Sequence, residues 1–197
     1  RQGKIRHFGV SNFGSPRLDE LPDLSEVTVN QLPYNLLCRA VEYDVLDKCA
    51  RNGIGVVGYM GLMQGILTGK FLTFDSIPPK RRRTRHFHHE RTREARHGEE
   101  GCEAETSQAL NDIRRICDDT GYSMAELSIK WIIANPLITC TLIGASNIKQ
   151  LEENVKAVEE PLSQDIVEAL NTATQPLKKA LGNHIDIFEG AESDRTL

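Results

Sequence analysis

Short apolar runs along the chain alternate with longer stretches in which apolar residues recur at helical spacing. The short runs predict strands, over residues 5–10, 27–31, 54–59 and 139–143, the third too apolar to have a solvent-exposed face. Helices are predicted over residues 41–50, 103–120 and 123–135, and from residues 147 and 163 onward. In these stretches apolar residues recur at helical spacing, Ser or Asn stands at several of the starts, and Gly or Asn-Gly stands at several of the ends. Strands that alternate with helices indicate parallel β/α units.

Four parallel strands are compatible with two architectures. They could form an open sheet, or half of an eight-stranded (β/α)8 barrel, and periodicity alone does not choose between them. No Gly-x-Gly-x-x-Gly string follows any predicted strand. Its absence counts against a dinucleotide-binding sheet of the doubly wound type.

Composition points to a water-soluble protein of one domain, or part of a larger one. The 197 residues are 39% hydrophobic and 26% charged, with a formal net charge of −4. No apolar run is long enough to span a membrane. Five scattered cysteines, with no CxxC pair, favour free thiols and a cytoplasmic location. Because residue 1 is Arg and no signal segment follows it, we expect an excerpt of a longer protein.

Polar residues stand where the predicted strands end, which is where β/α proteins place their sites. Ser11 and Asn12 follow the first strand and could hydrogen-bond a ligand amide or cap the next helix. Gln31 ends the second strand and is equally compatible with a structural amide. Tyr59 ends the third and could stack on a planar ring or lie in the core.

Two further segments suggest an anion site. The run 61–70 holds three glycines and ends in Lys70, so its backbone could approach a phosphate, although it lacks the spacing of a Walker A loop. The run 144–154 follows a strand and opens a helix, whose N-terminal N–H groups favour an anion. Gln150 and Asn154 lie one turn apart on its surface.

In their order along the chain, these segments resemble the aldo-keto reductases. The similarity rests on Arg6–Phe13, Asn30–Gln31, the run 59–71, Ile77–Pro79 and, most specifically, Gly144–Asn154. It extends over the whole chain, with bacterial-type aldo-keto reductases and potassium-channel β subunits as the most similar branches. The resemblance implies an α/β fold that is the C-terminal half, strands 5–8 with their helices, of a (β/α)8 TIM barrel.

The resemblance also implies the cofactor, NADP(H), and the residues that hold it. Ser11, Asn12 and Gln31 match the residues that bind the nicotinamide carboxamide, and Tyr59 matches the aromatic residue that stacks on the ring. The pyrophosphate loop is matched by Met60, Gly61, Leu62, Gln64 and Lys70, and a loop arginine that holds the cofactor is matched by Arg82. The contacts to the 2′-phosphate, ribose and adenine are matched by Gly144, Ser146, Gln150, Glu153 and Asn154.

The chain departs from the family pattern in three places. Gly61 stands where a proline is common, so the loop is expected to be less pre-organised. Ala145 stands where other branches have a lysine near the 2′-phosphate, a charge that Arg82 or Lys149 could supply. The family's catalytic Asp, Tyr, Lys and His belong to the first four strands, and no tyrosine or histidine here occupies a matching position. We therefore expect no catalytic residues in the chain.

A basic loop at about residues 71–101, inserted in a single oxidoreductase domain of residues 1–197, has the most unusual composition. Its arginines could bind a polyanion and its histidines could suggest a metal, but the His spacing fits no zinc pattern. A solvated loop that partly covers an anionic cofactor is the preferred interpretation.

These features predict an NAD(P)H-dependent oxidoreductase whose full-length form interconverts aldehydes or ketones and alcohols, the chain alone being inactive. The alternative is a non-catalytic NADP(H)-binding regulatory subunit. We expect a small carbonyl or alcohol substrate as partner, no nucleic acid, membrane or metal, and self-association of the half barrel through its unpaired sheet edges.

Overall fold

The computed structural model describes residues 3–190, 193 and 195–196. Its centre is a parallel sheet in the order β1-β2-β3-β4, formed by Phe8–Ser11, Val27–Pro33, Gly55–Tyr59 and Cys140–Thr141. All three pairings are parallel, which confirms the expected parallel strands in chain order. The carboxyl ends of β1 to β3 therefore meet along one edge of the sheet.

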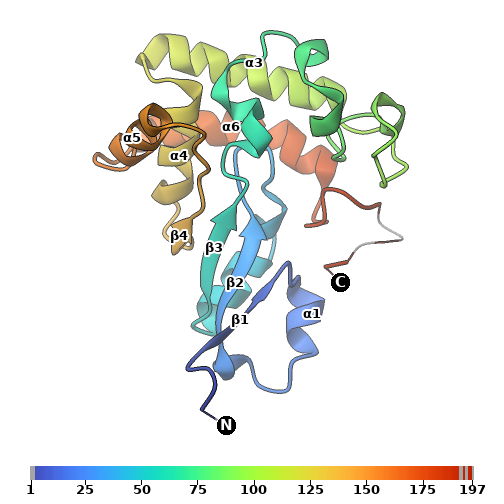
Figure 1. The fold of residues 1–197 in the computed structure, drawn as a ribbon, viewed down its shortest axis with the longest axis vertical. Helices are drawn as coiled ribbons and strands as arrows, with labels where there is room; N and C mark the ends of the chain where they lie inside the picture. Colours follow the sequence, from blue (N-terminus) through green and yellow to red (C-terminus); the bar gives the residue numbers. More distant parts are fainter. Residues whose placement is uncertain (1–2, 191–192, 194, 197) are drawn as a thin grey trace.

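Six α-helices accompany this sheet in the described residues: α1 (Ser15–Asp19), α2 (Val45–Arg51), α3 (Glu103–Thr120), α4 (Met124–Ala134), α5 (Ile148–Lys156) and α6 (Gln164–Leu181). The long helices α3 and α6 pack on each other at the end of the molecule toward which β2 and β3 point, and α1 lies beside β1 (Figure 1). Short 3-10 helices fill the connections: η1 (Leu24–Glu26), η2 (Ala40–Glu42), η3 (Met63–Thr68), η4 (Phe74–Ser76), η5 (Pro79–Arg81) and η6 (His89–Arg91).

Helix boundaries follow local capping chemistry. Gly121 ends α3 with φ +75° and donates its N–H to Cys117 O at 2.8 Å, as a glycine after a helix commonly does. The Ser123 hydroxyl accepts the N–H of Glu126 at 3.2 Å and starts α4. The Asn147 side chain accepts the N–H of Gln150 at 2.9 Å and starts α5.

The structure corrects three sequence expectations. β1 begins at Phe8 rather than Ile5, whose side chain is 71% exposed and so gains little from burial. The helix expected from residue 41 begins at Val45, because residues 40–42 form η2 instead. β3 is also not buried on both faces: Val56 is buried and Val57 only half-buried.

The core lies between the sheet and the helices. Its fully buried members include Leu32 and Val56 from the strands and Leu127, Ile132 and Leu170 from α4 and α6. In the described part of the chain no helix is long and apolar enough to cross a membrane. Residues 71–101 form a loop that carries only η4, η5 and η6.

Candidate cofactor-binding site

The polar residues predicted at the strand ends lie together at the carboxyl edge of the sheet. Ser11 stands opposite Gln31 in the β1–β2 register, and its hydroxyl donates to Gln31 O at 3.2 Å. The N–H of Asn12 donates to the same carbonyl at 2.9 Å. The Tyr59 hydroxyl reaches across from β3 and donates to Asn12 Oδ1 at 2.8 Å. A hydroxyl, two amides and an aromatic ring therefore share this edge.

Two buried asparagines hold the turns that follow the strands. The amide of Asn30 donates to Phe13 O at 2.8 Å and fixes the turn after β1. The amide of Asn35 donates to Met60 O at 3.0 Å, while its Oδ1 accepts the N–H of Leu37. Both asparagines are fully buried. They position the site from behind, a role that the sequence interpretation did not assign to them.

A cavity of about 990 Å³ begins at Met60, directly after Tyr59. Ten of the fifteen predicted cofactor residues line it: Met60, Gly61, Leu62, Gln64, Lys70, Gly144, Ser146, Gln150, Glu153 and Asn154. Its other walls include the start of α4, with Ser123 and Glu126. The volume is at the upper end of the range for small-molecule pockets. Segments far apart in the sequence thus enclose one space.

The far wall of this cavity is the N-terminal turn of α5. The Gln150 side chain accepts the N–H of Ser146 at 2.8 Å, and the Asn154 amide donates to Gly144 O at 3.4 Å. These contacts fold the segment 144–146 back over its own helix. Gly144, Ser146 and Gln150 are exposed and Asn154 is half-buried, so the amide and hydroxyl groups that these contacts leave unused are accessible to a ligand.

The loop between β3 and the cavity has an unusual backbone. Among the described residues, the non-glycine positions with positive φ are Asn12, Met60, Met63 and Gln64, at +45° to +60°. All four belong to the turns after β1 and β3. For residues other than glycine or asparagine this conformation costs about 1–2 kcal/mol each. Strain of this kind concentrates at functional sites, which supports a ligand site here.

Gly61 bears on the departure from the expected proline. A Cβ at this buried position would lie 2.4 Å from Ile143 Cδ1 and 3.0 Å from Ile132 Cδ1. A proline would therefore require both isoleucines to shift. Close packing thus fixes the path of the loop here, without the restricted backbone of a proline.

Arg82 and Lys149, the two cations predicted to compensate for Ala145, do not line the cavity. Arg82 lies outside the cavity lining and donates to Ile77 O at 2.6 Å and Asp75 O at 2.5 Å. Lys149 also lies outside it and pairs with Glu153 at 3.7 Å. Arg81 and Lys156, which the sequence interpretation did not select, do line the cavity. A run of three arginines gave no sequence signal to tell Arg81 from Arg82.

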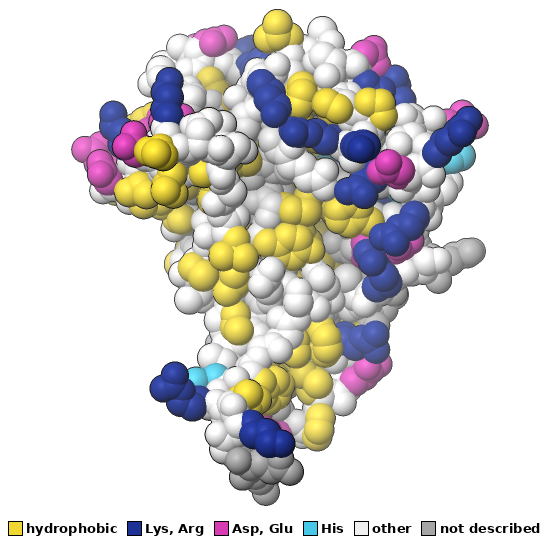
Figure 2. Space-filling view, viewed as in Figure 1, with side chains coloured by type: hydrophobic (Ala, Val, Ile, Leu, Met, Phe, Trp, Pro, Cys, Tyr) yellow, Lys and Arg dark blue, Asp and Glu magenta, His cyan; other side chains and the backbone are white. Residues whose placement is uncertain are grey.

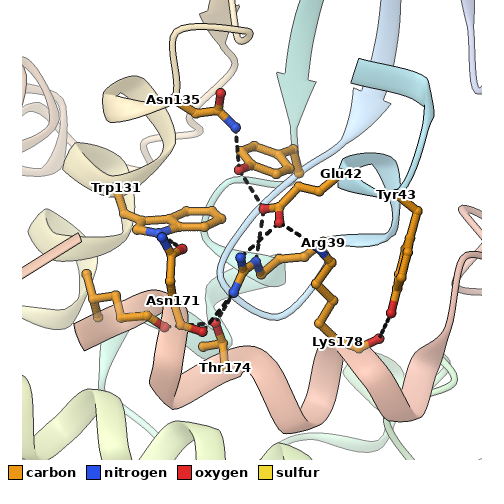
Figure 3. A network of polar contacts seen from close by, with 10 residues as sticks. Arg39, Glu42, Tyr43, Trp131, Asn135, Asn171, Thr174 and Lys178 are labelled. Carbon is orange, nitrogen blue, oxygen red and sulfur yellow. Dashed lines mark hydrogen bonds and ion pairs between the residues drawn. The ribbon is translucent and has the colours of Figure 1, made fainter. Parts of the chain in front are cut away.

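The segment after β2 is anchored by a network of buried polar groups (Figure 3). Glu42 accepts two hydrogen bonds from Arg39, at 2.9 and 2.8 Å, one from Lys178 at 2.8 Å and one from the Tyr34 hydroxyl at 2.8 Å. Arg39 also donates to Thr174 Oγ1 on α6 at 2.8 Å. The network ties this segment, which carries Asn35, to α6.

Aromatic contacts complete the anchor. The rings of Tyr34 and Trp131 stack at 5.0 Å, and the Arg39 guanidinium lies 5.3 Å from the Trp131 ring. Burial raises the pKa of Tyr34, and the neighbouring Glu42 carboxylate adds to this effect. Burial alone would raise the pKa of Glu42, but hydrogen bonds from its three donors outweigh it and hold that pKa below its usual value. Glu42 is therefore ionised at neutral pH.

The titratable groups beneath the site are neutral. Burial raises the pKa of Tyr59 to about 12 and that of Cys38 to about 12. Burial lowers the pKa of His86 to about 4; its Nε2 lies 2.8 Å from Leu37 O and so donates to it. In the described residues no cluster of three His, Cys, Asp or Glu side chains could hold a metal ion.

Comparison with known proteins identifies the family to which this chain is similar. The model of the aldo/keto reductase family matches residues 1–175. L-glyceraldehyde 3-phosphate reductase of Escherichia coli is 32% identical over 167 residues, 80% of this chain and 46% of the relative. A probable voltage-gated potassium channel subunit beta of Oryza sativa is 25% identical, over 90% of this chain and 55% of the relative. The chain thus spans about half the length of the curated relatives it matches.

Solved structures share the fold. An aldo/keto reductase from Klebsiella pneumoniae in complex with NADP and acetate has a TM-score of 0.59 at 23% identity, over 87% of this chain and 49% of that one. A second structure from that organism, in complex with NADPH, has a TM-score of 0.58. The expected resemblance is confirmed. The chain belongs to the aldo/keto reductase family.

Proposed function

We propose that this chain is the C-terminal, NADP(H)-binding half of a (β/α)8 barrel, strands 5–8 with their helices, in a protein that reversibly reduces aldehydes and ketones to alcohols. The observation that carries the proposal is the shared cavity: ten residues predicted to hold the cofactor line it. Tyr59, which directly precedes the lining residue Met60, donates to Asn12, whose N–H donates to Gln31 O at the edge of the sheet.

The donor set fits a dinucleotide. Tyr59 offers a half-buried aromatic face, on which a nicotinamide ring could stack, beside the amides of Asn12 and Gln31. Lys70 and the loop glycines face the anionic middle of such a ligand, and the α5 N-terminus, with Ser146 and Gln150, faces its other end. When bound, NADPH supplies the hydride for carbonyl reduction. The residues of this chain bind and orient the cofactor.

The 197-residue chain is expected to bind NADPH, and Gln150→Ala should weaken NADPH about tenfold more than NADH. The Gln150 amide stands at the end proposed for the 2′-phosphate, and a lost hydrogen bond to a charged group has this magnitude. Nicotinamide fluorescence titrations measure both affinities. Gln164→Ala, a surface substitution of the same kind on α6, is the control. Equal weakening of NADPH and NADH would move Gln150 away from the 2′-phosphate.

An alternative function is a regulatory, non-catalytic NADP(H)-binding subunit, which the similarity to the rice channel β subunit favours. Both functions require cofactor binding by this chain. Carbonyl reduction by the whole protein separates them, since only the enzyme turns over.

The basic loop is proposed to be a cofactor cover rather than a nucleic-acid site. Four of its arginines pair with carboxylates, as Arg83–Glu94, Arg85–Glu99, Arg91–Glu103 and Arg96–Glu189, at 2.7 to 3.7 Å. Figure 2 shows basic and acidic side chains intermixed on the right of the molecule, over this loop. A polyanion would have to displace these internal partners.

The half barrel is expected to self-associate at micromolar concentrations. β1 pairs only with β2 and β4 only with β3, so two edges are free in the described sheet. On α5, Ile148, Leu151 and Val155 are 55–75% exposed, and apolar side chains gather there and over the sheet (Figure 2). Exposed edges and apolar stripes promote association.

Sedimentation velocity over a concentration series measures this. Leu151→Glu should shift the distribution toward monomer, whereas Gln164→Glu, which adds the same charge on α6, should not. A wild-type chain that stays monomeric throughout the series would contradict the proposal.

A further inference from the structure

A second cavity lies apart from the proposed cofactor site. It has a volume of about 230 Å³ and is enclosed by α3, Ile66 of η3 and the loop of residues 71–77. None of its lining residues also lines the larger cavity of about 990 Å³. Leu72 and Thr73 line it and are themselves exposed, so the cavity is open to solvent. A ligand could therefore enter it while the larger cavity is occupied.

Most of the wall of this second cavity is apolar. Six of its ten lining residues are apolar: Ile66, Phe71, Leu72, Phe74, Ile77 and Leu110. Ile66, Ile77 and Leu110 belong to the buried core, and the centre of the Phe74 ring lies 4.7 Å from that of the buried Phe87. The wall is thus held in place by the core. Because a cavity of about 150 Å³ is large enough for benzene, this one has room for a single ring with a small substituent.

One cation, Arg114 of α3, lines the second cavity. Its Nη1 donates to Asn111 Oδ1 at 2.8 Å and its Nη2 to Phe71 O at 2.6 Å, so two neutral acceptors fix the guanidinium. Within the described part of the chain no carboxylate pairs with Arg114, and the nearby Asp112 is paired with Arg115 instead. The two hydrogen bonds leave three of the five N–H groups of an arginine for a ligand.

We propose that the second cavity binds a small apolar monocarboxylate, with its carboxylate on Arg114 and its ring among the apolar lining residues. One cation without a charged partner matches one negative charge, and a planar guanidinium can bind both oxygens of a carboxylate. A phosphate carries more charge and would lose its water against an apolar wall without further cations to compensate. Binding here is independent of the proposed cofactor site, since the two cavities share no lining residue.

Benzoate is the probe, and benzamide, which has nearly the same shape without the charge, is its control. Each is titrated into the isotope-labelled 197-residue chain and followed in amide NMR spectra. Benzoate should shift the signals of lining residues such as Phe71 and Asn111, and should leave those of Ser146 and Gln150, in the larger cavity, in place. Benzamide should bind about tenfold or more weakly than benzoate, because it lacks the charge-assisted hydrogen bonds to Arg114.

Two variants remove the site in different ways. Arg114→Ala should weaken benzoate about tenfold or more. Arg115→Ala removes the neighbouring exposed arginine of the same helix, and should change the affinity by less than about twofold, because an exposed charge acts only through screened attraction. Ser107→Leu fills the cavity from a half-buried position on α3 and keeps the guanidinium, so it should abolish saturable binding.

Because Arg114 also holds Phe71 O, Ser107→Leu supplies the test if the thermal midpoint shows that Arg114→Ala is unfolded. Equal affinities for benzoate and benzamide would overturn the proposal, as would an Arg114→Ala chain that binds benzoate like Arg115→Ala. Saturable binding that survives Ser107→Leu, signals that shift at Ser146 and Gln150 in place of Phe71 and Asn111, or no saturable shift in the wild-type chain would also show that it is wrong.

Discussion

Glu42→Gln is expected to lower the free energy of unfolding by about 3–5 kcal/mol, the cost typical of leaving buried charges without their partner. Glu42 is the shared counter-charge of Arg39 and Lys178, and the three side chains are only 7–15% exposed. An amide of the same shape leaves two cations facing each other. Urea unfolding followed by circular dichroism measures the loss.

A matched substitution on the surface separates the loss of this buried network from the general effect of removing a carboxylate. Glu20 pairs with Arg17 at 3.2 Å on the surface, where its side chain is 62% exposed. Glu20→Gln should therefore cost less than about 1 kcal/mol. Adding Lys178→Met to Glu42→Gln removes one of the two orphaned cations and should restore part of the stability. Equal losses for Glu42→Gln and Glu20→Gln would show that the network contributes little.

The same carboxylate gives a pH signature. Its pKa in the folded protein lies below the unfolded value of 4.5, so its contribution is complete above pH 4.5 and is lost as pH falls through the folded pKa. His86, with a pKa lowered from 6.5 to about 4, destabilises the protein as pH falls from 6.5 to 4. This second loss is common to wild type and variant. The difference between their stability curves should therefore shrink only below about pH 4.5.

Much of the site could be predicted because it lies at strand ends and at one helix start. Ser11, Gln31 and Tyr59 each end a recognisable strand, and parallel order brings these ends to one edge. The direction of side chains inside an irregular loop could not be predicted from the sequence. Arg81 and Arg82 are adjacent in sequence, and only the fold decides that one enters the cavity while the other binds carbonyls.

The fold shows the same contrast between what the local sequence pattern predicts and what long-range contacts decide. Helix α3 matches its predicted span, residues 103–120, because apolar spacing and the Gly121 stop agree. The helix expected from Val41 did not form there, because Arg39 and Glu42 turn toward α6 and hold residues 40–42 as a 3-10 turn. That contact joins segments more than 130 residues apart. Local pattern carries no information about such a partner.

The chain by itself is expected to show no carbonyl reduction above the background oxidation of NADPH. Reduction requires an acid that protonates the carbonyl oxygen as hydride arrives, and its loss costs about two to four orders of magnitude. Two tyrosine hydroxyls are committed elsewhere, that of Tyr34 to Glu42 and that of Tyr43 to Lys178 O. The centre of the Tyr122 ring lies 5.4 Å from Lys130 Nζ on α4. Spectrophotometric assays with simple aldehydes measure the rate.

Tyr59 is the remaining candidate acid, and its geometry argues against that role. Its hydroxyl donates to Asn12 Oδ1, and burial raises its pKa to about 12, whereas a useful acid has a pKa near the working pH. Tyr59→Phe keeps the ring and removes the hydroxyl. Aldehyde-dependent NADPH oxidation by the chain, abolished by Tyr59→Phe, would show that Tyr59 is the acid. If the proposed function is correct, joining the chain to a segment that carries the family's catalytic residues should restore turnover, and Tyr59→Phe should then leave most of it intact.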